Sequence, residues 1–185
     1  VKTVVVDPRF TADAAKAVID LKRYALYPDY KGSYMASALY NSEVIWARLY
    51  NNKLYMEFHV ESSHMPNGYY GGAQIHPTQN IVDEYEMTSG LLPREDPLYD
   101  PQNPYVNRDP RFYDCILYDG ALFQGREVEA FLPGGKDSKE GSVASWNATT
   151  TGYYARKFID ESIIVPSNTN VGNTPWPFFR YNEIL

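Results

Sequence analysis

Reactive side chains are most concentrated in residues 103–120, NPYVNRDPRFYDCILYDG. Two arginines, Arg108 and Arg111, flank Asp109, and two more aspartates follow. Two carboxylates facing each other at about 5–9 Å could hydrolyse a glycosidic bond. Asp109 also stands where a helix N-cap would, with Pro110 at the first helical position. Because arginines beside such a cap commonly bind carboxylates or loop carbonyls, we favour a structural joint over an acid–base enzyme site.

The single cysteine and the three histidines give little support for catalysis or metal binding. Cys115 lies in an apolar run that favours a strand, where a free cysteine usually behaves as a small buried hydrophobe. The histidines lack the spacing of a helix-borne zinc motif. Glu57 and Glu61 would share a strand face with His59, but zinc sites normally combine several preorganised ligands. The sequence also has no nucleophile elbow, P-loop or dinucleotide fingerprint, so we expect no metal and no cofactor.

Tyrosine dominates the aromatic residues, with 17 Tyr against 8 Phe and 3 Trp. A tyrosine ring has an apolar face and a polar tip, which suits a half-wet binding surface. Tyr69 and Tyr70 lie in NGYYGG, residues 67–72, where glycines let a loop turn its side chains outward. Exposed rings there, or Trp146 in a later polar loop, could stack on a sugar while Asn or His side chains fix its hydroxyl groups. The alternative is that these rings pin loops to the body of the protein.

The first element along the chain is a predicted helix near residues 12–24. Thr11 can serve as its N-cap, and Ala14, Val18 and Leu21 recur at spacings that place them on one face. Prolines and glycines farther along prevent the helix from continuing. Its apolar face needs a partner elsewhere in the protein.

Short strands and long loops are predicted for the rest of the chain. Residues 44–50 and 54–61 favour strands, and the turn at 51–52 would join them into a hairpin. Residues 62–80 contain too much Pro and Gly for regular structure, and residues 133–151 indicate a polar surface loop. Further elements are a helix within 77–87 capped by Thr78, a helical turn at 109–114, and strands or extended segments at 115–120, 127–132, 152–160 and 175–180.

Composition excludes several classes of protein. The 185 residues suffice for one ordinary domain or for a large piece of a bigger protein, and 13 Pro and 12 Gly predict a loop-rich fold. The net charge is −6 and no Lys/Arg-rich run occurs, so we expect no nucleic-acid partner. No apolar run approaches the roughly 20 residues that span a bilayer. The N-terminal run VKTVVVDPRF is too short for a signal peptide.

Taken in order, six segments resemble the SusD/RagB family, whose members are nutrient-capturing surface lipoproteins of gut and oral Bacteroidetes. They are AKAVIDLKRYALYPDY, NSEVIW, HPTQNIVDEYEM, YDPQNPYVNRDPRFYDCILYDG, GYYARKFID and WPFFRYNEIL. The resemblance covers nearly the whole chain. It implies an α+β, loop-rich fold. Residues 1–35 would contain one TPR-like scaffold helix, near 12–24, and its connector, and residues 36–185 would form the loop-rich mixed region of a SusD-like domain. We therefore expect residues 1–185 to be one partial SusD-like domain, with most of the helical scaffold elsewhere in a longer chain.

The resemblance also implies a function. Members bind oligosaccharides without cleaving them and cap a SusC-like, TonB-dependent transporter in the outer membrane. The protein would then be surface-exposed and lipid-anchored through a part not present here, and its partners would be a glycan, the transporter and the rest of its own chain. The alternatives are a RagB-like protein that captures peptides and a carbohydrate-active enzyme that uses a carboxylate pair.

Site residues follow from the resemblance by region. In starch-binding members an arc of aromatic rings holds the glycan, partly between the segments that match SEVIW and PTQNIVDEYEM. With the loop tryptophan added, the predicted ligand-binding residues are Tyr69, Tyr70, His64, Asn67 and Trp146. The NRDPR motif occurs in members whatever their ligand, which favours the structural joint, with Asp109 as cap and Arg108 and Arg111 tying loops together.

Overall fold

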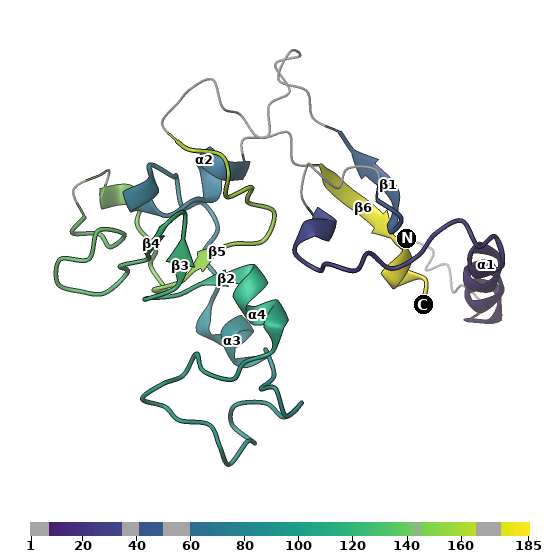
Figure 1. Ribbon diagram of the computed structural model, residues 1–185, viewed down its shortest axis with the longest axis horizontal. Helices are drawn as coiled ribbons and strands as arrows, with labels where there is room; N and C mark the ends of the chain where they lie inside the picture. The colour runs from purple at the N-terminus through teal and green to yellow at the C-terminus, as the bar shows by residue number, and fades with distance from the viewer. Residues whose placement is uncertain (1–7, 35–40, 50–59, 142, 144, 166–174) are drawn as a thin grey trace, which may run out of the picture. The chain divides into compact units, whose positions relative to one another are not determined.

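The computed structural model describes residues 8–34, 41–49, 60–141, 143, 145–165 and 175–185 (Figure 1). Two compact units make up the chain. Unit 1 comprises residues 1–49 and 175–185, and unit 2 comprises residues 50–174. Short helices and short strands alternate with long irregular segments in both units. The predicted α+β, loop-rich fold is confirmed.

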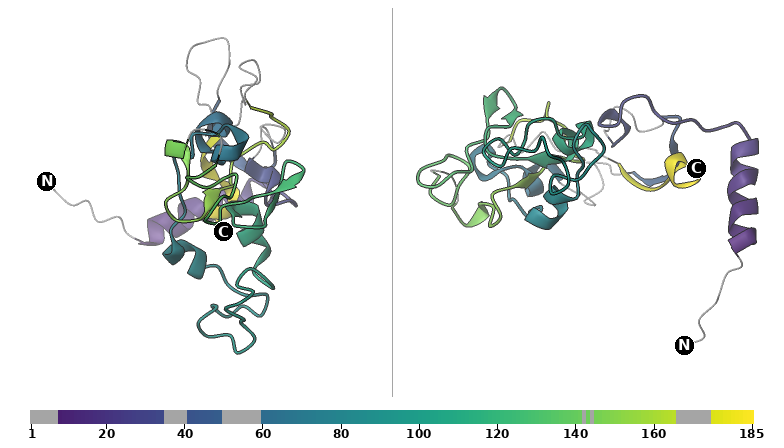
Figure 2. Two further views of the ribbon diagram at one scale, coloured as in Figure 1. Left: turned by 90° about the vertical axis from the view of Figure 1, so that its left-hand side faces the viewer. Right: turned by 90° about the horizontal axis from the view of Figure 1, so that it is seen from below.

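Unit 1 contains a two-stranded antiparallel sheet. Strand β1, Val44–Arg48, pairs with β6, Trp176–Arg180, and the two strands lie side by side in both Figure 1 and Figure 2. Val44 lies opposite Arg180, and the register shifts around Trp46. Pairing of segments so far apart in sequence makes unit 2 an insertion between the two strands. Two 3₁₀ turns complete the unit, Gly32–Tyr34 and Tyr181–Glu183.

A buried arginine fastens β6 to the rest of unit 1. The guanidinium of Arg180 forms an ion pair with the buried Glu43 at 3.3 Å. It also donates to the hydroxyl of Tyr34 at 3.0 Å and lies 4.3 Å from the centre of that ring. Glu43 in turn accepts from the backbone N–H of Tyr27 at 3.0 Å. A buried charge needs such partners, so Arg180 specifies where the C-terminal strand binds.

Helix α1, Pro8–Asp20, differs from the helix predicted near 12–24. Thr11 lies inside the helix, so its predicted N-cap role is wrong: the proline at residue 8 already starts the helix, as proline in a first turn can. The apolar face of α1 is poorly covered in the described part of the chain. Val18 is half-buried and Leu21 is exposed.

Unit 2 is assembled from very short elements. They are α2 Val60–His64, η3 Asn67–Tyr69, α3 Gln79–Asp83, α4 Pro110–Cys115, β2 Ile116–Leu117, β3 Leu122–Phe123, β4 Arg126–Glu127, η4 Ser145–Asn147 and β5 Tyr154–Ala155. Strand β2 pairs with β5, and β3 pairs with β4, both antiparallel. The core comes from loops as much as from these elements: Val60, Met65, Tyr69, Ala73, Leu117, Ala121, Phe123, Val128, Tyr154 and Ile159.

Several predicted boundaries around residue 60 are wrong. Val60 and Glu61 belong to helix α2, so the strand predicted over 54–61 does not reach its expected end. The rest of that strand and the hairpin turn lie among residues 50–59, outside the described residues. The segment 62–80, predicted to lack regular structure, contains the end of α2 and the 3₁₀ turn η3.

Three further predictions need partial correction. Cys115 is buried, as expected, but it is the last residue of helix α4 and lies before the strand. The loop 133–151 is only partly a surface loop, because Asp137 and Ser138 are fully buried within it. Thr78 does stand at the N-cap position of α3, but its side chain makes no capping hydrogen bond.

The N-cap predicted at Asp109 is confirmed. Its carboxylate accepts from the backbone N–H of Arg111 at 2.8 Å, and Pro110 occupies the first helical position of α4. The Arg111 side chain binds the same carboxylate through Nε at 2.9 Å and Nη2 at 2.7 Å. Arg111 thus reinforces the cap from its own helix, close to the surface.

Arg108 holds three segments together from the inside. Its guanidinium is 2% exposed and donates to the carbonyls of Val82 at 2.5 Å, Tyr85 at 2.9 Å and Pro104 at 3.0 Å. It also lies 4.7 Å from the centre of the Phe112 ring. Arg108 therefore links three segments: the end of α3, the end of the long 88–107 loop and helix α4.

Candidate functional site

Tyr70 projects from a tightly closed turn in unit 2. Its side chain is 54% exposed, and its backbone is left-handed, with φ 61° and ψ 21°. The turn is closed by hydrogen bonds from the backbone N–H groups of Tyr70 to Asn67 at 2.9 Å and of Gly71 to Pro66 at 3.2 Å. A non-glycine residue in this conformation costs roughly 1–3 kcal/mol. The surrounding turn must therefore hold the backbone of Tyr70 in this conformation.

Tyr69 faces the opposite way. Of the two roles considered for this pair, ligand-stacking rings or rings that pin loops to the body, Tyr69 fits the second, because it is 8% exposed and belongs to the core. Its hydroxyl donates to the carbonyl of Phe123 at 2.8 Å, and the two rings meet edge to face at 4.9 Å. Burial raises the pKa of Tyr69 to about 12. The ring anchors the turn that presents Tyr70.

An ion pair clamps the other side of this turn. Arg126 binds both carboxylate oxygens of Asp137, at 2.7 and 2.9 Å, and its guanidinium lies 3.8 Å from the centre of the Tyr69 ring. Gly68 passes so close that a Cβ atom there would meet the Asp137 carboxylate and lie 2.7 Å from Arg126 Nη2. Asn67 is fully buried and donates to the Ser138 carbonyl at 3.1 Å. The turn and the 136–138 segment therefore form one rigid body.

The other predicted residues are divided between interior and surface. His64, at the end of α2, is buried, and its Nδ1 lies 2.9 Å from the Val60 carbonyl. Burial lowers its pKa, partly offset by that hydrogen bond and by the charge of Glu61. Trp146, in η4, is 83% exposed. Of the five predicted ligand-binding residues, Tyr70 and Trp146 thus present their rings to solvent, while Tyr69, Asn67 and His64 point inward.

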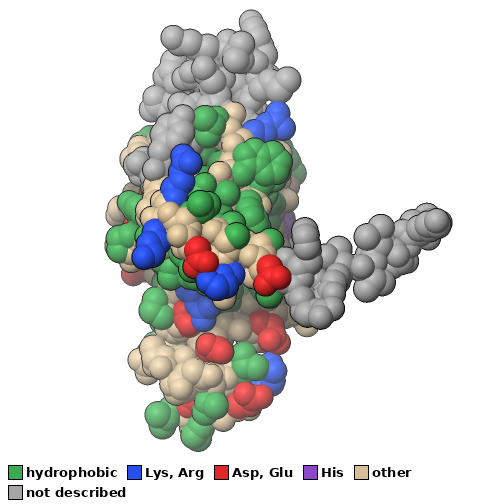
Figure 3. Space-filling model, turned by 90° about the vertical axis from the view of Figure 1, so that its right-hand side faces the viewer, with side chains coloured by type: hydrophobic (Ala, Val, Ile, Leu, Met, Phe, Trp, Pro, Cys, Tyr) green, Lys and Arg blue, Asp and Glu red, His purple; other side chains and the backbone are tan. Residues whose placement is uncertain are grey.

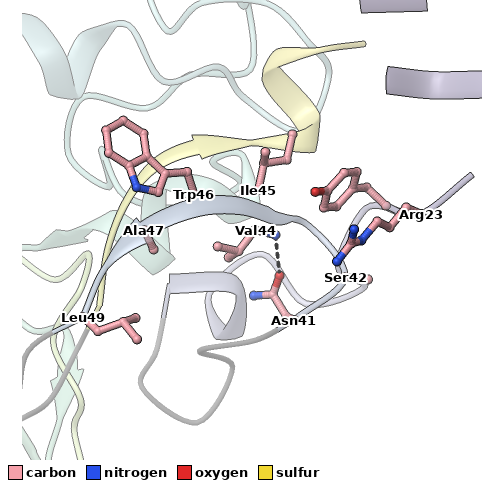
Figure 4. A pocket seen from close by; sticks show the side chains of 9 residues that line it. Arg23, Asn41, Ser42, Val44, Ile45, Trp46, Ala47 and Leu49 are labelled. Atoms are coloured by element: carbon pink, nitrogen blue, oxygen red, sulfur yellow. Dashed lines mark hydrogen bonds between the residues drawn. The ribbon is translucent and has the colours of Figure 1, made fainter. Parts of the chain in front are cut away.

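Unit 1 carries a pocket that sequence reasoning missed (Figure 4). Its volume is about 430 Å³, and it is lined by Arg23, Tyr24, Asn41, Ser42, Val44, Ile45, Trp46, Ala47 and Leu49. The Oδ1 atom of Asn41 already accepts hydrogen bonds from the backbone N–H groups of Glu43 at 2.8 Å and Val44 at 3.1 Å. Trp46 stacks on Phe178 at 4.8 Å. The lining is mainly apolar, which suits protein packing more than recognition of hydroxyl groups.

A second missed pocket lies in unit 2, beside the end of α3. It has a volume of about 270 Å³ and is lined by Asp83, Pro93, Arg94 and Tyr99. Two charged side chains, a proline and a tyrosine ring form its wall. In the sequence, Asp83 is one of many carboxylates between residues 83 and 114 that could form a pair. No local pattern shows that Arg94 and Tyr99 fold back onto it.

Among the described residues, no group of three or more His, Cys, Asp or Glu side chains is placed to hold a metal ion. Of the metal cluster considered from sequence, Glu57 and His59 lie outside the described residues and Glu61 is in α2. Within the same described part of the chain, no helix combines the length and hydrophobicity required to cross a membrane.

Comparisons with known proteins identify similar chains. A sequence model of the SusD family matches residues 35–185. A SusD-like carbohydrate-binding protein from Bacteroides fragilis NCTC 9343 is 26% identical with a TM-score of 0.79, over 94% of this chain and 34% of that one. A SusD-like protein from the same strain is 22% identical with a TM-score of 0.67, over 96% of this chain and 38% of that one. No curated protein matches. This chain spans about a third of the length of these two structures.

Proposed function

This chain belongs to the SusD family, and from that membership we propose that it is part of a non-catalytic protein that binds oligosaccharides at the cell surface. The observation that carries the proposal is the 26% identity to a SusD-like carbohydrate-binding protein over 94% of this chain. The chemistry of its surface is compatible with that role. Exposed tyrosine and tryptophan rings offer the flat apolar faces on which sugar rings stack.

Tyr70 is the residue on which we base the ligand site. Ligand binding is strongest where the protein loses little freedom on association. The turn around Tyr70 meets that condition, because the buried Tyr69 and the Arg126–Asp137 ion pair hold it from beneath. Trp146, exposed in η4, is the second aromatic surface in the proposal. Asn67 and His64 support the site from the interior.

The proposal extends to the setting of the whole protein. We propose that residues 1–185 form part of a single SusD-like domain, with α1 as one helix of a larger scaffold. The protein would be held at the outer membrane by a lipid on another part of the chain. It would deliver glycans to a SusC-like, TonB-dependent transporter for nutrient uptake.

We favour binding without turnover over glycoside hydrolysis because Asp109, the carboxylate that stands out in the sequence, already has a structural role as the cap of α4. A glycosidase acid needs a raised pKa. The hydrogen bonds from Arg111 instead lower the pKa of Asp109, and its carboxylate already caps α4. The Asp109 carboxylate therefore has a structural role, as the cap of α4.

A glycan array with the full-length protein tests the proposal. It should carry neutral and acidic oligosaccharides, and a peptide library should be screened in parallel. We expect binding to one class of oligosaccharide, with no new reducing ends after prolonged incubation. Release of shorter sugars would show an enzyme, and binding to peptides alone would show a peptide-capturing relative. Either result would overturn the proposal.

A further inference from the structure

We propose that the pocket formed by Asp83, Pro93, Arg94 and Tyr99 is a second sugar subsite, which takes one uncharged pyranose ring of a bound oligosaccharide. This inference rests on the proposed function. The pocket volume of about 270 Å³ lies just below the roughly 300–1,000 Å³ of sites that hold drug-sized ligands. It therefore suits a single sugar ring rather than a longer segment.

Asp83 is preorganised as a hydrogen-bond acceptor by a chain of side chains that leads inward. Gln79, one turn earlier on α3, donates through Nε2 to Asp83 Oδ1 at 2.7 Å. The Oε1 atom of Gln79 accepts from the hydroxyl of Tyr153 at 2.9 Å, and that hydroxyl accepts from Tyr105 at 3.2 Å. A carboxylate can accept about four hydrogen bonds. The one from Gln79 fixes the group and leaves capacity for sugar hydroxyls.

Arg94 supplies donors on the same pocket wall. Its Nη1 donates to Glu84 Oε1 at 3.3 Å, and its Nε lies 3.8 Å from Glu95 Oε1. The two carboxylates orient the guanidinium, which has five N–H groups in a planar fork. Adjacent hydroxyls of a pyranose both donate and accept, so an acceptor at Asp83 and donors at Arg94 complement them. The Tyr99 ring and Pro93 offer apolar surface for the C–H groups of the sugar.

The pocket is held in shape from behind. Arg108 binds the carbonyls of Val82 and Tyr85, on either side of the end of α3. Within the 88–107 loop, Asp96 accepts from the hydroxyl of Ser89 at 2.5 Å and from the backbone N–H of Leu98 at 2.8 Å. Figures 1 and 2 show this loop extending away from α3 and α4. These contacts order the backbone on both sides of the pocket, which reduces the entropy lost on binding.

Local charge gives the subsite its selectivity. Two carboxylates, those of Glu84 and Glu95, pair with the guanidinium of Arg94, and a third carboxylate, that of Asp83, lines the same pocket. Like charges brought together at an interface cost several kcal/mol. A uronic acid or a sulfated sugar would place another anion beside Asp83. The pocket should accordingly accept neutral sugars and reject acidic ones.

The test measures binding of the full-length protein by titration calorimetry with maltohexaose, cellohexaose, xylohexaose, mannohexaose and hexagalacturonate as probes. Tyr99→Ala and Asp83→Asn remove the ring and the charge, and Tyr70→Ala removes the primary ring. Tyr99→Phe keeps the ring. Asp100→Asn is the matched charge control, because Asp100 binds Asn103 in its own loop and does not line the pocket.

For a neutral probe that binds the wild type, we expect Tyr99→Ala and Asp83→Asn each to weaken binding about five- to tenfold. Tyr99→Phe should retain more affinity than Tyr99→Ala because it keeps the ring, and Asp100→Asn should stay within about twofold. Asp83→Asn should also improve the relative affinity for hexagalacturonate, a change that a purely structural role for Asp83 would not produce.

Failure of the subsite and failure of the proposed function give different results. If Tyr70→Ala weakens binding while Tyr99→Ala and Asp83→Asn do not, the protein binds glycans and the subsite is refuted. If the wild type binds none of the probes and none of the array sugars, both ideas are overturned. Because Asp83→Asn preserves side-chain size, it remains decisive even if Tyr99→Ala disturbs folding.

Discussion

Arg108 and Arg111 stand three residues apart and have different structural roles. Arg108 is buried and donates to three backbone carbonyls, while the side chain of Arg111 is 54% exposed and binds Asp109 within its own helix. In the sequence, both are positively charged residues next to the predicted start of a helix. The buried arginine stabilises the tertiary structure, whereas the exposed one stabilises a helix end.

Replacing the two arginines should therefore have unequal effects on stability. Arg108→Ala leaves buried carbonyls without donors, which costs about 1–3 kcal/mol for each unsatisfied group, so we expect a loss of roughly 3 kcal/mol or more. Arg111→Ala removes an exposed ion pair and should cost about 1 kcal/mol or less. Urea unfolding of the full-length protein measures both. Equal losses would contradict the assignment of Arg108 as the central tie.

The cap at Asp109 should make stability depend on pH in acid. Its hydrogen bond with the Arg111 side chain lowers the pKa of Asp109 below the unfolded value of about 3.9. The contribution of the ionised cap is then fully present above that value, and it is lost as the pH falls through the lower folded pKa. Asp109→Asn keeps an acceptor without a titrating charge. The stability difference between wild type and this variant should shrink from pH 7 to pH 3; a constant difference would exclude the mechanism.

Tyr69 and Tyr70 should respond to mutation in opposite ways. Tyr70→Ala should weaken glycan binding by about 1–2 kcal/mol, the contribution of a stacked ring, with an unchanged melting temperature. Tyr69→Ala empties part of the core and should cost about 3–5 kcal/mol of folding free energy. Tyr70→Phe, which keeps the ring, is the control for binding. Normal affinity of Tyr70→Ala in calorimetry would move the ligand site to another loop.

At the scale of elements, local signals were predictable and long-range pairing was not. Helix α4 was predicted because Asp109 and Pro110 satisfy the free N–H groups of its first turn by themselves. The pairing of β1 with β6 could not be predicted, because no local feature of Val44–Arg48 indicates a partner strand so far along the chain. Short strands carry weak intrinsic preference, and their partners are set by the tertiary structure.

Which side chains of the candidate region are exposed was not predictable from the sequence. Tyr69 and Tyr70 are the same residue type in the same glycine-rich run. Only the packing of Phe123 and Arg126, more than fifty residues away, determines that one ring is buried and the other exposed. For the same reason the pocket at Asp83 was invisible in the sequence. Its tyrosine and arginine come from a loop whose path depends on the buried Arg108.

The turn that presents Tyr70 should be intolerant of side chains where the backbone passes closest. A Cβ atom at Gly71 would collide with the backbone of Met65, so Gly71→Ala should destabilise unit 2 by several kcal/mol. Gly90 has φ +82° but open space around it, so Gly90→Ala should cost only about 1–2 kcal/mol from backbone strain. Thermal unfolding of the two variants provides the comparison. Similar losses would show that the turn can rearrange.

At the scale of the whole molecule, unit 1 exposes many large apolar side chains. Figure 3 shows hydrophobic side chains at the surface of one face of the molecule. The exposed ones include Leu21, Leu26, Trp46, Leu49, Trp176, Phe178, Phe179 and Leu185. Apolar patches on this scale usually mark a contact surface. We propose that this surface is covered by further protein.

A protein of residues 1–185 alone should therefore bind a hydrophobic dye and self-associate. The full-length protein should do neither, because the rest of its chain would cover unit 1. Trp46→Ser should reduce dye binding by the short protein more than Leu98→Ser, a change at an exposed site in unit 2. Size-exclusion chromatography and dye fluorescence are the measurements. A monodisperse, sharply melting monomer of 185 residues would show that unit 1 needs no further partner.

The pairing of β1 with β6 has a consequence for the order of folding. Roughly 130 residues separate Arg48 from Trp176, and closing such a loop costs on the order of 4 kcal/mol of chain entropy. During synthesis, β1 therefore stays unpaired, with Trp46 exposed, until β6 near the end of the 185 residues has been made. Folding of the inserted unit 2 first would shorten that loop. Until then the unpaired strand is an aggregation hazard, and we expect chaperones to bind there.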